Sequence, residues 1–314
     1  MRWFAFAACI ICVCVESAEA QESRIVRRWQ GDLGFSQFGV FSKDGSRLVY
    51  TKDNDVFIVD TETGENAVQL SGHEKPVWLA RFSGDDKRVV SIGQDESIRV
   101  WDTESQKQIS QLSANTADRC SVLTVSKDAK LVAFSTGDNR MLRVMNMTKE
   151  SELQRIGLTD AEVVWRCVTL DGRWGMSNGI RNDTKIWDLS TGAPLEIDNG
   201  HHNYCGQFTH DGTQAMLAGA FSWDLWDIRR KAKLKSGTVT GGHIYAIATS
   251  SNTTRFLTGL SDGTVWLWDV KSGKELLVFR GHTKAVAAVM ISPDKKVAVS
   301  RDNSGEIILW RLPK

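Results

Sequence analysis

Short apolar runs alternate with polar turns along nearly the whole chain. The run RLVYT (47–51) follows the turn FSKDGS (41–46), and RVVSI (88–92) follows FSGDDK (82–87) in the same way. The Asp-Gly and Asp-Lys pairs in these turns favour tight hairpins between antiparallel strands. A second turn then leads to a third strand, and a polar turn such as TETGE (61–65) leads to a fourth. The pattern predicts an all-β chain that repeats a unit of four antiparallel strands.

The third strand of each unit ends in a related tetrad. Four tetrads read RVWD, KIWD, DLWD and WLWD, and three weaker copies read FIVD, RVMN and ILWR. Their last residues are Asp60, Asp102, Asn146, Asp188, Asp227, Asp269 and Arg311, separated by 42, 44, 42, 39, 42 and 42 residues. This period predicts an array of seven repeats that forms a single domain over residues 21–314.

Gly-His pairs precede the first strand of several repeats, at 72–73, 200–201, 242–243 and 281–282. Gly-His before the first strand and Trp-Asp at the end of the third, with this period, resemble the WD40 repeat (G-protein beta-type) family over about residues 24–314. The resemblance implies a seven-bladed β-propeller of four-stranded antiparallel blades.

The two ends of the chain predict how this propeller closes. The last repeat stops at ILWRLPK (308–314) without a fourth strand. Near the other end, SRIVRRWQGD (23–32) aligns with KELLVFRGHT (274–283), which is a fourth strand leading into a Gly-His position. We therefore expect the N-terminal strand to complete the last blade, so that no sheet edge is left open.

The resemblance also implies a buried hydrogen-bonded tetrad of His, Ser or Thr, Asp and Trp within a blade. Two repeats match it, with the residues His73, Ser91, Asp95 and Trp101 in the second and His243, Thr258, Asp262 and Trp268 in the sixth. A hydroxyl, an imidazole and a carboxylate are also the parts of a nucleophilic triad. Two identical active sites in different blades would face different directions, so we interpret both sets as structural.

The other repeats depart from this pattern. The seventh keeps His282, Ser300 and Trp310 but has Ser304 at the position of the aspartate. The remaining departures are His201 with Trp226 in a shortened fifth repeat, Leu158 and Arg181 in the fourth, Ser113-Ala114 in the third and Gly31-Asp32 in the first. We expect these blades to depend more on packing against their neighbours.

Residues near the start of each innermost strand are the candidates for partner binding, because these starts border one rim of the central channel. Four or five residues before the first turn of a repeat lie Phe38, Trp78, Trp165, Tyr204 and Tyr245, and Arg119 lies at the start of the third repeat's strand. Aromatic residues together with arginine are frequent energetic anchors of protein interfaces. The alternative is that these rings only fill space between the blades.

Charge and motifs argue against several other functions. The 314 residues carry a net charge of +1, which gives no reason to expect nucleic acid as a partner. The run RRKAKLKSG (229–237) falls on an expected outer strand, where it either discourages edge pairing or binds an acidic partner. There is no GxSxG, HExxH or P-loop motif, and GHHN (200–203), with His202, has no carboxylate or cysteine set beside it. His210 is the other histidine outside the Gly-His pairs. We predict no catalytic residue, no cofactor and no metal site.

The first twenty residues differ from the repeats. Arg2 precedes an uncharged apolar run at 3–15, and Ala18-Glu19-Ala20 resembles a signal-peptidase site. These features predict a cleaved signal peptide at 1–20 and an exported protein, periplasmic or extracellular, without integral membrane association. An uncleaved anchor or a packed N-terminal arm is the alternative, and without a functional leader the location would be cytoplasmic. The three cysteines beyond the leader, Cys120, Cys167 and Cys205, are expected to be small buried hydrophobes.

The sequence therefore predicts a non-catalytic scaffold that mediates protein–protein interaction and is monomeric by itself. One alternative is a small-ligand binder or propeller enzyme that uses the central channel, which would require polar, titratable side chains converging on one channel mouth. Another is a constitutive subunit of an exported complex, with the aromatic rim permanently buried.

Overall fold

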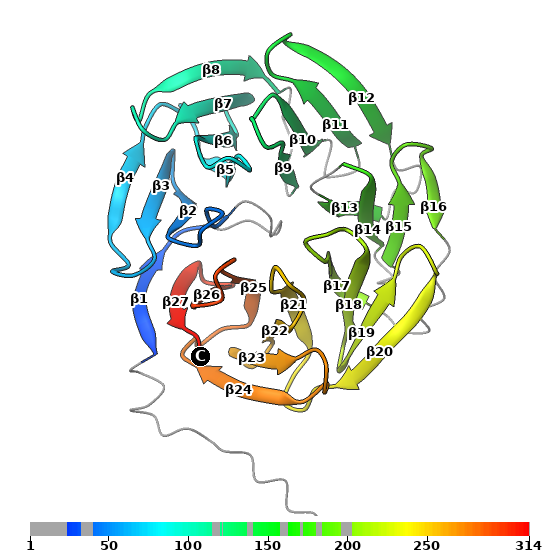
Figure 1. Ribbon diagram of the computed structural model, residues 1–314. Coiled ribbons are helices and arrows are strands. Elements are labelled where there is room, and N and C mark those ends of the chain that lie inside the picture. The colour runs from blue at the N-terminus through cyan, green and yellow to red at the C-terminus, as the bar shows by residue number, and fades with distance from the viewer. Residues whose placement is uncertain are drawn as a thin grey trace, which may run out of the picture.

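The computed structural model describes residues 24–32, 40–114, 120, 122–136, 141–157, 163–169, 172–179, 184–195 and 203–313. These residues form 27 strands and no helix. The strands make seven antiparallel sheets arranged around a central axis (Figure 1). The prediction of an all-β, seven-bladed propeller is confirmed. The predicted leader, residues 1–20, lies outside the described residues.

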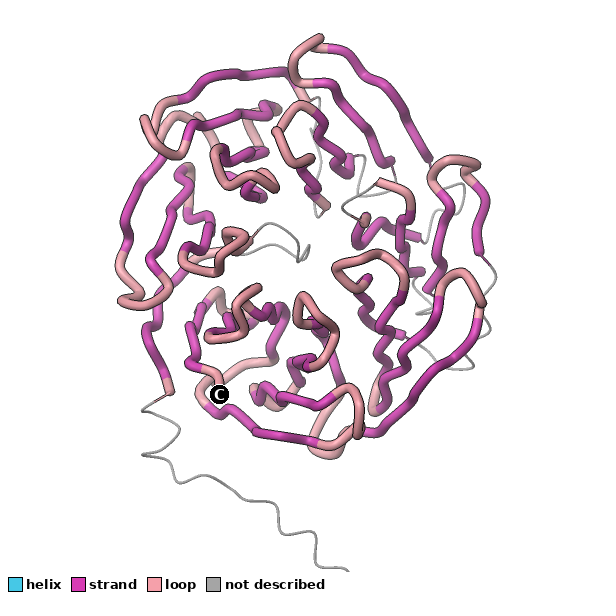
Figure 2. The backbone as a smooth tube through the Cα atoms, in the orientation of Figure 1, coloured by secondary structure: helices cyan, strands magenta, loops and turns pink. Residues whose placement is uncertain are grey.

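Each sheet is one blade, whose first strand lies next to the axis and whose last strand lies at the perimeter (Figures 1 and 2). Blade 2 contains β5 (Val77–Phe82), β6 (Arg88–Gly93), β7 (Ser97–Asp102) and β8 (Gln108–Ser113). Blade 3 contains β9 (Leu123–Val125), β10 (Leu131–Thr136), β11 (Met141–Asn146) and β12 (Ser151–Gly157). Blade 4 contains β13 (Val163–Val168), β14 (Trp174–Gly179), β15 (Thr184–Asp188) and β16 (Ala193–Leu195).

Blades 5 and 6 repeat this order. Blade 5 contains β17 (Asn203–Phe208), β18 (Gln214–Gly219), β19 (Ser222–Asp227) and β20 (Ala232–Thr238). Blade 6 contains β21 (Ile244–Thr249), β22 (Arg255–Leu260), β23 (Thr264–Asp269) and β24 (Glu275–Arg280). Blade 1 has three described strands, β2 (Arg47–Lys52), β3 (Asp55–Asp60) and β4 (Asn66–Leu70), and the segment before β2 at 33–39 lies outside the described residues.

Blade 7 joins the two ends of the chain. It contains β25 (Val286–Ile291), β26 (Val297–Asp302) and β27 (Glu306–Arg311), and its outer strand is β1 (Ile25–Gln30). β1 pairs antiparallel with β27, from Ile25 opposite Trp310 to Gln30 opposite Glu306. The predicted closure by the N-terminal strand is thus present, and it gives β27 a partner on both sides.

The hydrophobic core lies between neighbouring blades. Between blades 6 and 7, for example, Leu257 and Val265 pack in one buried cluster with Val289 and Ile308. Successive side chains of a strand point to opposite faces of its sheet, so both faces of a blade are apolar where they meet the next blade. Cys120 and Cys167 are buried, Cys205 is half-buried, and all three are free thiols. Burial raises the pKa of Cys120 to about 11 and that of Cys167 to about 12, which makes these thiols unreactive.

Five of the described innermost strands contain a β-bulge. The pairing of innermost and second strands shifts between Val77 and Leu79 in β5, and at the corresponding places in β17, β21 and β25. In β13 the shift comes two residues later in the strand, between Trp165 and Cys167. The residues passed over by these β-bulges are Trp78, Arg166, Tyr204, Tyr245 and Ala287. A bulge leaves one residue unpaired and turns it away from the regular alternation.

In the described part of the chain no helix has the length and apolarity needed to cross a membrane.

Candidate functional site

The four predicted residues of the second repeat form one hydrogen-bonded network in blade 2. His73 Nδ1 lies 2.9 Å from each carboxylate oxygen of Asp95, and His73 Nε2 lies 2.7 Å from Ser91 Oγ. Trp101 Nε1 donates a hydrogen bond of 2.8 Å to the same Ser91 oxygen. The network joins the loop before β5 to β6 and β7.

The environment of this network fits a fastening role. Burial lowers the pKa of His73, which favours the neutral imidazole. Burial raises the pKa of Asp95, but hydrogen bonds from His73, Ser97 and the Glu74 backbone outweigh it and bring that pKa to about 2. Ser91 has no exposed surface. A hydroxyl closed off in this way cannot reach a substrate, so the set is not an active site.

The structure corrects the role of His243 in the sixth repeat. Trp268 Nε1 does donate to Thr258 Oγ1 at 3.0 Å, and Asp262 accepts from Thr264. The His243 carbonyl, however, accepts from Ser261 N at 2.9 Å, as the Pro76 carbonyl does from Gln94 N in blade 2. His243 therefore stands at the position of Pro76 and not at that of His73. The reason is spacing: His73 precedes Ser91 by 18 residues, and His243 precedes Thr258 by only 15.

The seventh repeat keeps its imidazole but not its predicted fourth member. His282 Nε2 lies 2.7 Å from Ser300 Oγ, which also accepts from Trp310 Nε1 at 2.7 Å. Ser304, at the expected place of the aspartate, instead donates to Asp302 Oδ1 at 2.6 Å. Asp302 and Glu306 flank the imidazole, and sequence reasoning missed both because neither stands at the family offset.

The residues predicted to form the binding rim differ in their exposure to solvent. Trp165 has no exposed surface and packs in the core between blades 3 and 4, so its assignment to the rim is wrong. The reason is its offset: Trp165 lies four residues before the first turn, where the buried Leu79 and Ala246 stand in blades 2 and 6. The residue that the bulge in β13 passes over is Arg166. Trp78 is half-buried against the core, whereas Tyr245 is 42 % exposed. Phe38, Arg119 and the side chain of Tyr204 lie outside the described residues.

Tyr245 belongs to an exposed aromatic cluster with Phe221 and His243. The His243 ring lies 4.6 Å from the Phe221 ring and 6.5 Å from the Tyr245 ring, measured between centroids. Phe221 is 51 % exposed in the turn between β18 and β19. A backbone bond from Ile244 N to Ala220 O holds this turn against the start of β21. An apolar aromatic in an otherwise tight turn was the one sequence signal that could have revealed Phe221.

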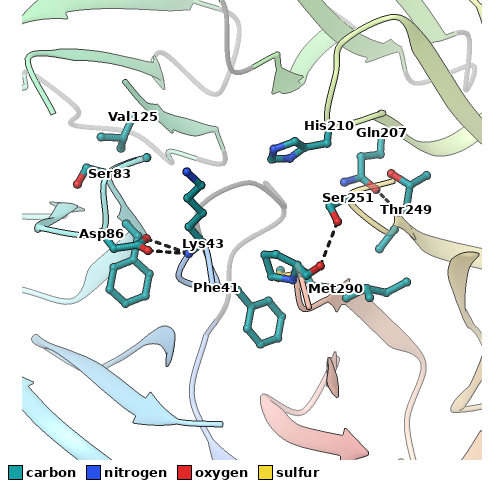
Figure 3. Close-up of a pocket in the computed structure, with 15 residues that line it drawn as sticks. Phe41, Lys43, Ser83, Asp86, Val125, Gln207, His210, Thr249, Ser251 and Met290 are labelled. Carbon is teal, nitrogen blue, oxygen red and sulfur yellow. Dashed lines mark hydrogen bonds between the residues drawn. The ribbon is translucent and has the colours of Figure 1, made fainter. Parts of the chain in front are cut away.

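A cavity of about 430 Å³ occupies the opposite mouth of the channel, where the innermost strands end (Figure 3). Phe41, Phe82 and Met290 supply part of its apolar wall, and Lys43 and His210 reach into it from different blades. Both carboxylate oxygens of Asp86 accept from Lys43 N, at 3.0 and 2.8 Å. The titratable side chains of this cavity, Lys43, Asp86 and His210, thus come from different blades. The carboxylate of Asp86 already accepts hydrogen bonds from a backbone N–H group.

The basic run lies only in part on β20, the outer strand of blade 5, because Arg229, Arg230 and Lys231 belong to the turn before it. Lys233 Nζ forms an ion pair of 3.0 Å with the buried Asp224, and Lys235 Nζ donates to the Val270 carbonyl of blade 6 at 2.9 Å. These two lysines therefore bind the protein itself, which favours a structural role for the run.

Comparison with known proteins agrees with this geometry. The family described as "WD domain, G-beta repeat" matches residues 64–102, 234–269 and 273–311. Three segments of the chain therefore match the WD40 repeat model, and they fall in blades 1 and 2, 5 and 6, and 6 and 7. In the described residues, one strand of each blade ends at the last residue of one of the seven tetrads, and these last residues are Asp60, Asp102, Asn146, Asp188, Asp227, Asp269 and Arg311.

Several curated proteins resemble this chain at low identity. "Serine-threonine kinase receptor-associated protein" of Dictyostelium discoideum is 22 % identical over 290 residues, which cover 89 % of this chain and 94 % of that protein. "WD repeat-containing protein 26 homolog" of Arabidopsis thaliana is 23 % identical, with 94 % of this chain and 51 % of that protein covered. The chain thus spans nearly all of the first relative and about half of the second.

A solved structure has the same fold. A chain in the "Crystal Structure of Mitotic Checkpoint Complex" superposes with a TM-score of 0.77 at 14 % identity, covering 100 % of this chain and 99 % of that one. At this identity the likeness shows the propeller fold alone.

Proposed function

We propose that this WD40 propeller is a non-catalytic scaffold that binds a protein partner on the face where the innermost strands begin. The aromatic cluster of Phe221, His243 and Tyr245 carries the proposal. Two large aromatic side chains there are 51 % and 42 % exposed and are bridged by a histidine ring. Large aromatic side chains in a contiguous exposed patch are typical of interaction sites, because burying them releases much apolar surface from water.

The cluster is also held in place before any partner arrives. Val239 N donates to Phe221 O at 2.8 Å, and Ile244 N donates to Ala220 O at 3.2 Å. The turn that presents Phe221 is thus tied to the end of blade 5 and to the start of blade 6. A surface that is already ordered loses little conformational entropy on binding.

The proposal also includes the cellular compartment in which the protein acts. The basic start, the apolar run at 3–15 and the Ala18-Glu19-Ala20 sequence support cleavage after residue 20 and function in an exported compartment. Mass spectrometry of the N-terminus of the fractionated protein tests this. A mature chain that begins at Gln21 is expected, and an intact Met1 would contradict export by a cleaved leader.

The binding surface can be tested with a matched pair of double variants. Phe221→Ser with Tyr245→Ser removes the cluster, and Ile109→Ser with Leu276→Ser removes two apolar side chains of similar exposure, 50 % and 47 %, from the outer strands β8 and β24. We expect affinity capture from the source cells to lose a partner with the first variant and to retain it with the second, both variants being folded by circular dichroism.

Two outcomes would contradict the proposal. If both double variants recover the same partners as the wild type, the cluster is not the binding surface. If both lose them equally, recovery depends on general apolar adhesion and not on this face.

A further inference from the structure

Blades 2 and 7 contain the same Ser–His–Trp frame, and this makes their difference informative. The imidazole Nε2 lies 2.7 Å from the serine Oγ in both blades, and the tryptophan Nε1 donates to that oxygen at 2.8 Å in blade 2 and 2.7 Å in blade 7. The two histidines are therefore anchored alike through Nε2. They differ in what faces Nδ1.

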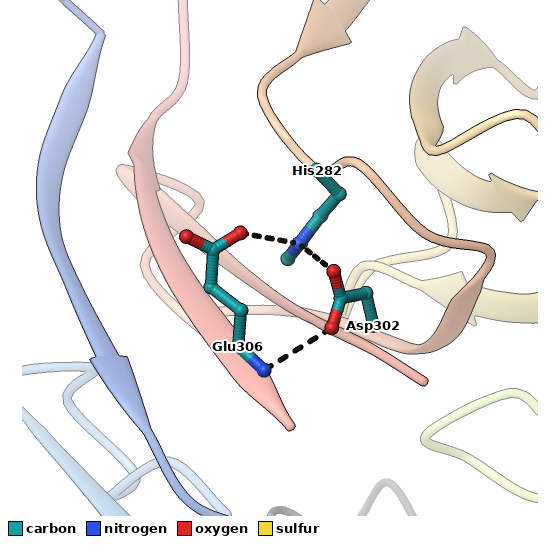
Figure 4. Close-up of side chains that lie close together, drawn as sticks. All are labelled: His282, Asp302 and Glu306. Atoms are coloured by element: carbon teal, nitrogen blue, oxygen red, sulfur yellow. Dashed lines mark hydrogen bonds and ion pairs between the residues drawn. The ribbon is translucent and has the colours of Figure 1, made fainter. Parts of the chain in front are cut away.

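In blade 7 the His282 Nδ1 atom faces two carboxylates instead of one. It lies 3.4 Å from Asp302 Oδ2 and 3.3 Å from Glu306 Oε2 (Figure 4). The side chains of His282 and Asp302 have no exposed surface. Nδ1 and Oδ2 are nonetheless without a hydrogen-bond partner among the described residues. In blade 2, by contrast, Nδ1 lies 2.9 Å from Asp95.

The remaining oxygens of both carboxylates are already engaged. Asp302 Oδ1 accepts from Ser304 N at 2.9 Å, from Ser304 Oγ at 2.6 Å and from Glu306 N at 3.1 Å. Glu306 Oε1 accepts from Arg28 Nη1 at 3.1 Å. These bonds hold Oδ2 and Oε2 toward the imidazole, and one ligand atom from each of the three residues lies within 4.8 Å of the others.

We propose that His282, Asp302 and Glu306 form a binding site for a divalent metal ion of the Zn²⁺ type. Zinc bonds nitrogen and carboxylate oxygen at about 2.0–2.2 Å in a tetrahedral arrangement, which separates two ligand atoms by about 3.3–3.5 Å. The Nδ1–Oδ2 and Nδ1–Oε2 distances of 3.4 and 3.3 Å match that separation. Three protein ligands leave the fourth position to water.

Charge and access also suit a cation. Two carboxylates and the single guanidinium of Arg28 leave one negative charge in a mostly buried site, and a metal ion would satisfy both unpartnered atoms at once. Ser300 Oγ can accept from Nε2–H, which leaves Nδ1 free of a proton and directs its lone pair toward the ion. The Glu306 side chain is 23 % exposed and provides an entrance from solvent.

The position in the fold gives the ion a structural role. Its ligands come from the loop before β25, the end of β26 and the start of β27. Glu306 also lies opposite Gln30 and binds Arg28, both on the closing strand β1. Because the ion would join the last blade to the strand that closes the propeller, it would stabilise the ring at its seam.

The full chain, stripped with a chelator and dialysed, tests the site by zinc calorimetry and by elemental analysis. We expect one zinc ion per chain, a higher melting temperature on zinc addition, and at least about a tenfold loss of affinity in Glu306→Gln. The Asp95→Asn variant in blade 2 is the matched control and should bind zinc as the wild type does. Co²⁺ substitution should give the visible spectrum of a tetrahedral site without thiolate ligands.

A folded wild type that binds no zinc would overturn the proposal. Zinc binding that persists unchanged in both Glu306→Gln and Asp302→Asn would also overturn it, because the metal would then be held elsewhere, for example at a cysteine.

Discussion

Trp101 Nε1 donates a hydrogen bond of 2.8 Å to Ser91 Oγ across the neighbouring strands β7 and β6. The same bond joins Trp187 to Ser177 in blade 4, Trp268 to Thr258 in blade 6 and Trp310 to Ser300 in blade 7. In all four blades the hydroxyl stands ten residues before the tryptophan. A large indole can be buried between blades at low cost when its polar N–H finds an acceptor, and the hydroxyl supplies that acceptor.

Replacing Ser91 with alanine should destabilise the protein. The change leaves both Trp101 Nε1 and His73 Nε2 without a partner in a buried site, and each such group costs about 1–3 kcal/mol. We expect the free energy of unfolding in urea to fall by about 2–4 kcal/mol. Ser113→Ala, at an exposed position of β8, is the control and should change it by less than about 0.5 kcal/mol. Equal effects of the two substitutions would show that the network contributes nothing.

The blade 2 network should make stability depend on pH. Asp95 and Arg99 face His73, and burial lowers the His73 pKa below its ordinary 6.5. The unfolded chain therefore binds a proton more readily than the folded one, and stability falls as the pH drops below 6.5. Asp95, with a pKa of about 2, adds a second loss below its ordinary pKa of 3.8.

Urea unfolding measured between pH 7.5 and 5 tests the histidine part of this dependence. The wild type should lose stability steadily on acidification, whereas His73→Gln, though less stable throughout, should show a shallower dependence. A wild-type stability that rises as the pH is lowered through this range would contradict the assigned direction of the shift.

Two glycines with similar backbone conformations should differ sharply in their tolerance of alanine. Gly263 has a φ of +86°, and a Cβ atom there would lie 2.6 Å from the carbonyl oxygen of His282 in the neighbouring blade. Gly192 has a φ of +72°, but a Cβ atom would meet nothing within 4 Å. We expect Gly192→Ala to cost about 1–2 kcal/mol of unfolding free energy from the left-handed backbone alone. Gly263→Ala should cost a further 1–3 kcal/mol or so from the clash. Similar losses would mean that the blades separate easily at this point.

Within the basic run, Lys233 should matter for stability and Arg229 should not. Lys233→Ala leaves the carboxylate of Asp224, which is 3 % exposed, without the ion pair at 3.0 Å. We expect a loss of about 1–3 kcal/mol in thermal or urea unfolding, because an unpaired buried charge is costly. Arg229 is exposed, and Arg229→Ala should change stability by less than about 0.5 kcal/mol. Binding of an acidic partner that requires Arg229 and leaves Lys233 dispensable would instead favour the interaction role for this run.

Much of the architecture could be predicted from local sequence features. The alternation of apolar and polar residues, the Asp-containing turns and the Trp-Asp tetrads each act over a few residues, so the strand order and the seven repeats followed from them. The propeller ring was what the resemblance to the WD40 family implied. The complementary ends, SRIVRRWQGD and ILWRLPK, also led correctly to the pairing of β1 with β27. The spacing of 15 residues between His243 and Thr258 was visible too, and it already separated this histidine from His73.

Which side chains reach solvent, or come together in one site, could be decided only by the tertiary structure. Trp165 lies in the core, and the residue that the bulge in β13 passes over is Arg166; the place of a bulge depends on the pairing of two strands rather than on either sequence alone. Phe221 and Tyr245 come together because blade 5 packs against blade 6, and Glu306 meets His282 because β27 lies beside β26. The sequence by itself determined the repeat, since its strands and turns arise from contacts between near neighbours in the chain, and the complementary chain ends indicated the closed ring. Only the tertiary structure decided which residues form a surface or a ligand set, since such sets depend on the register and packing of strands from different elements.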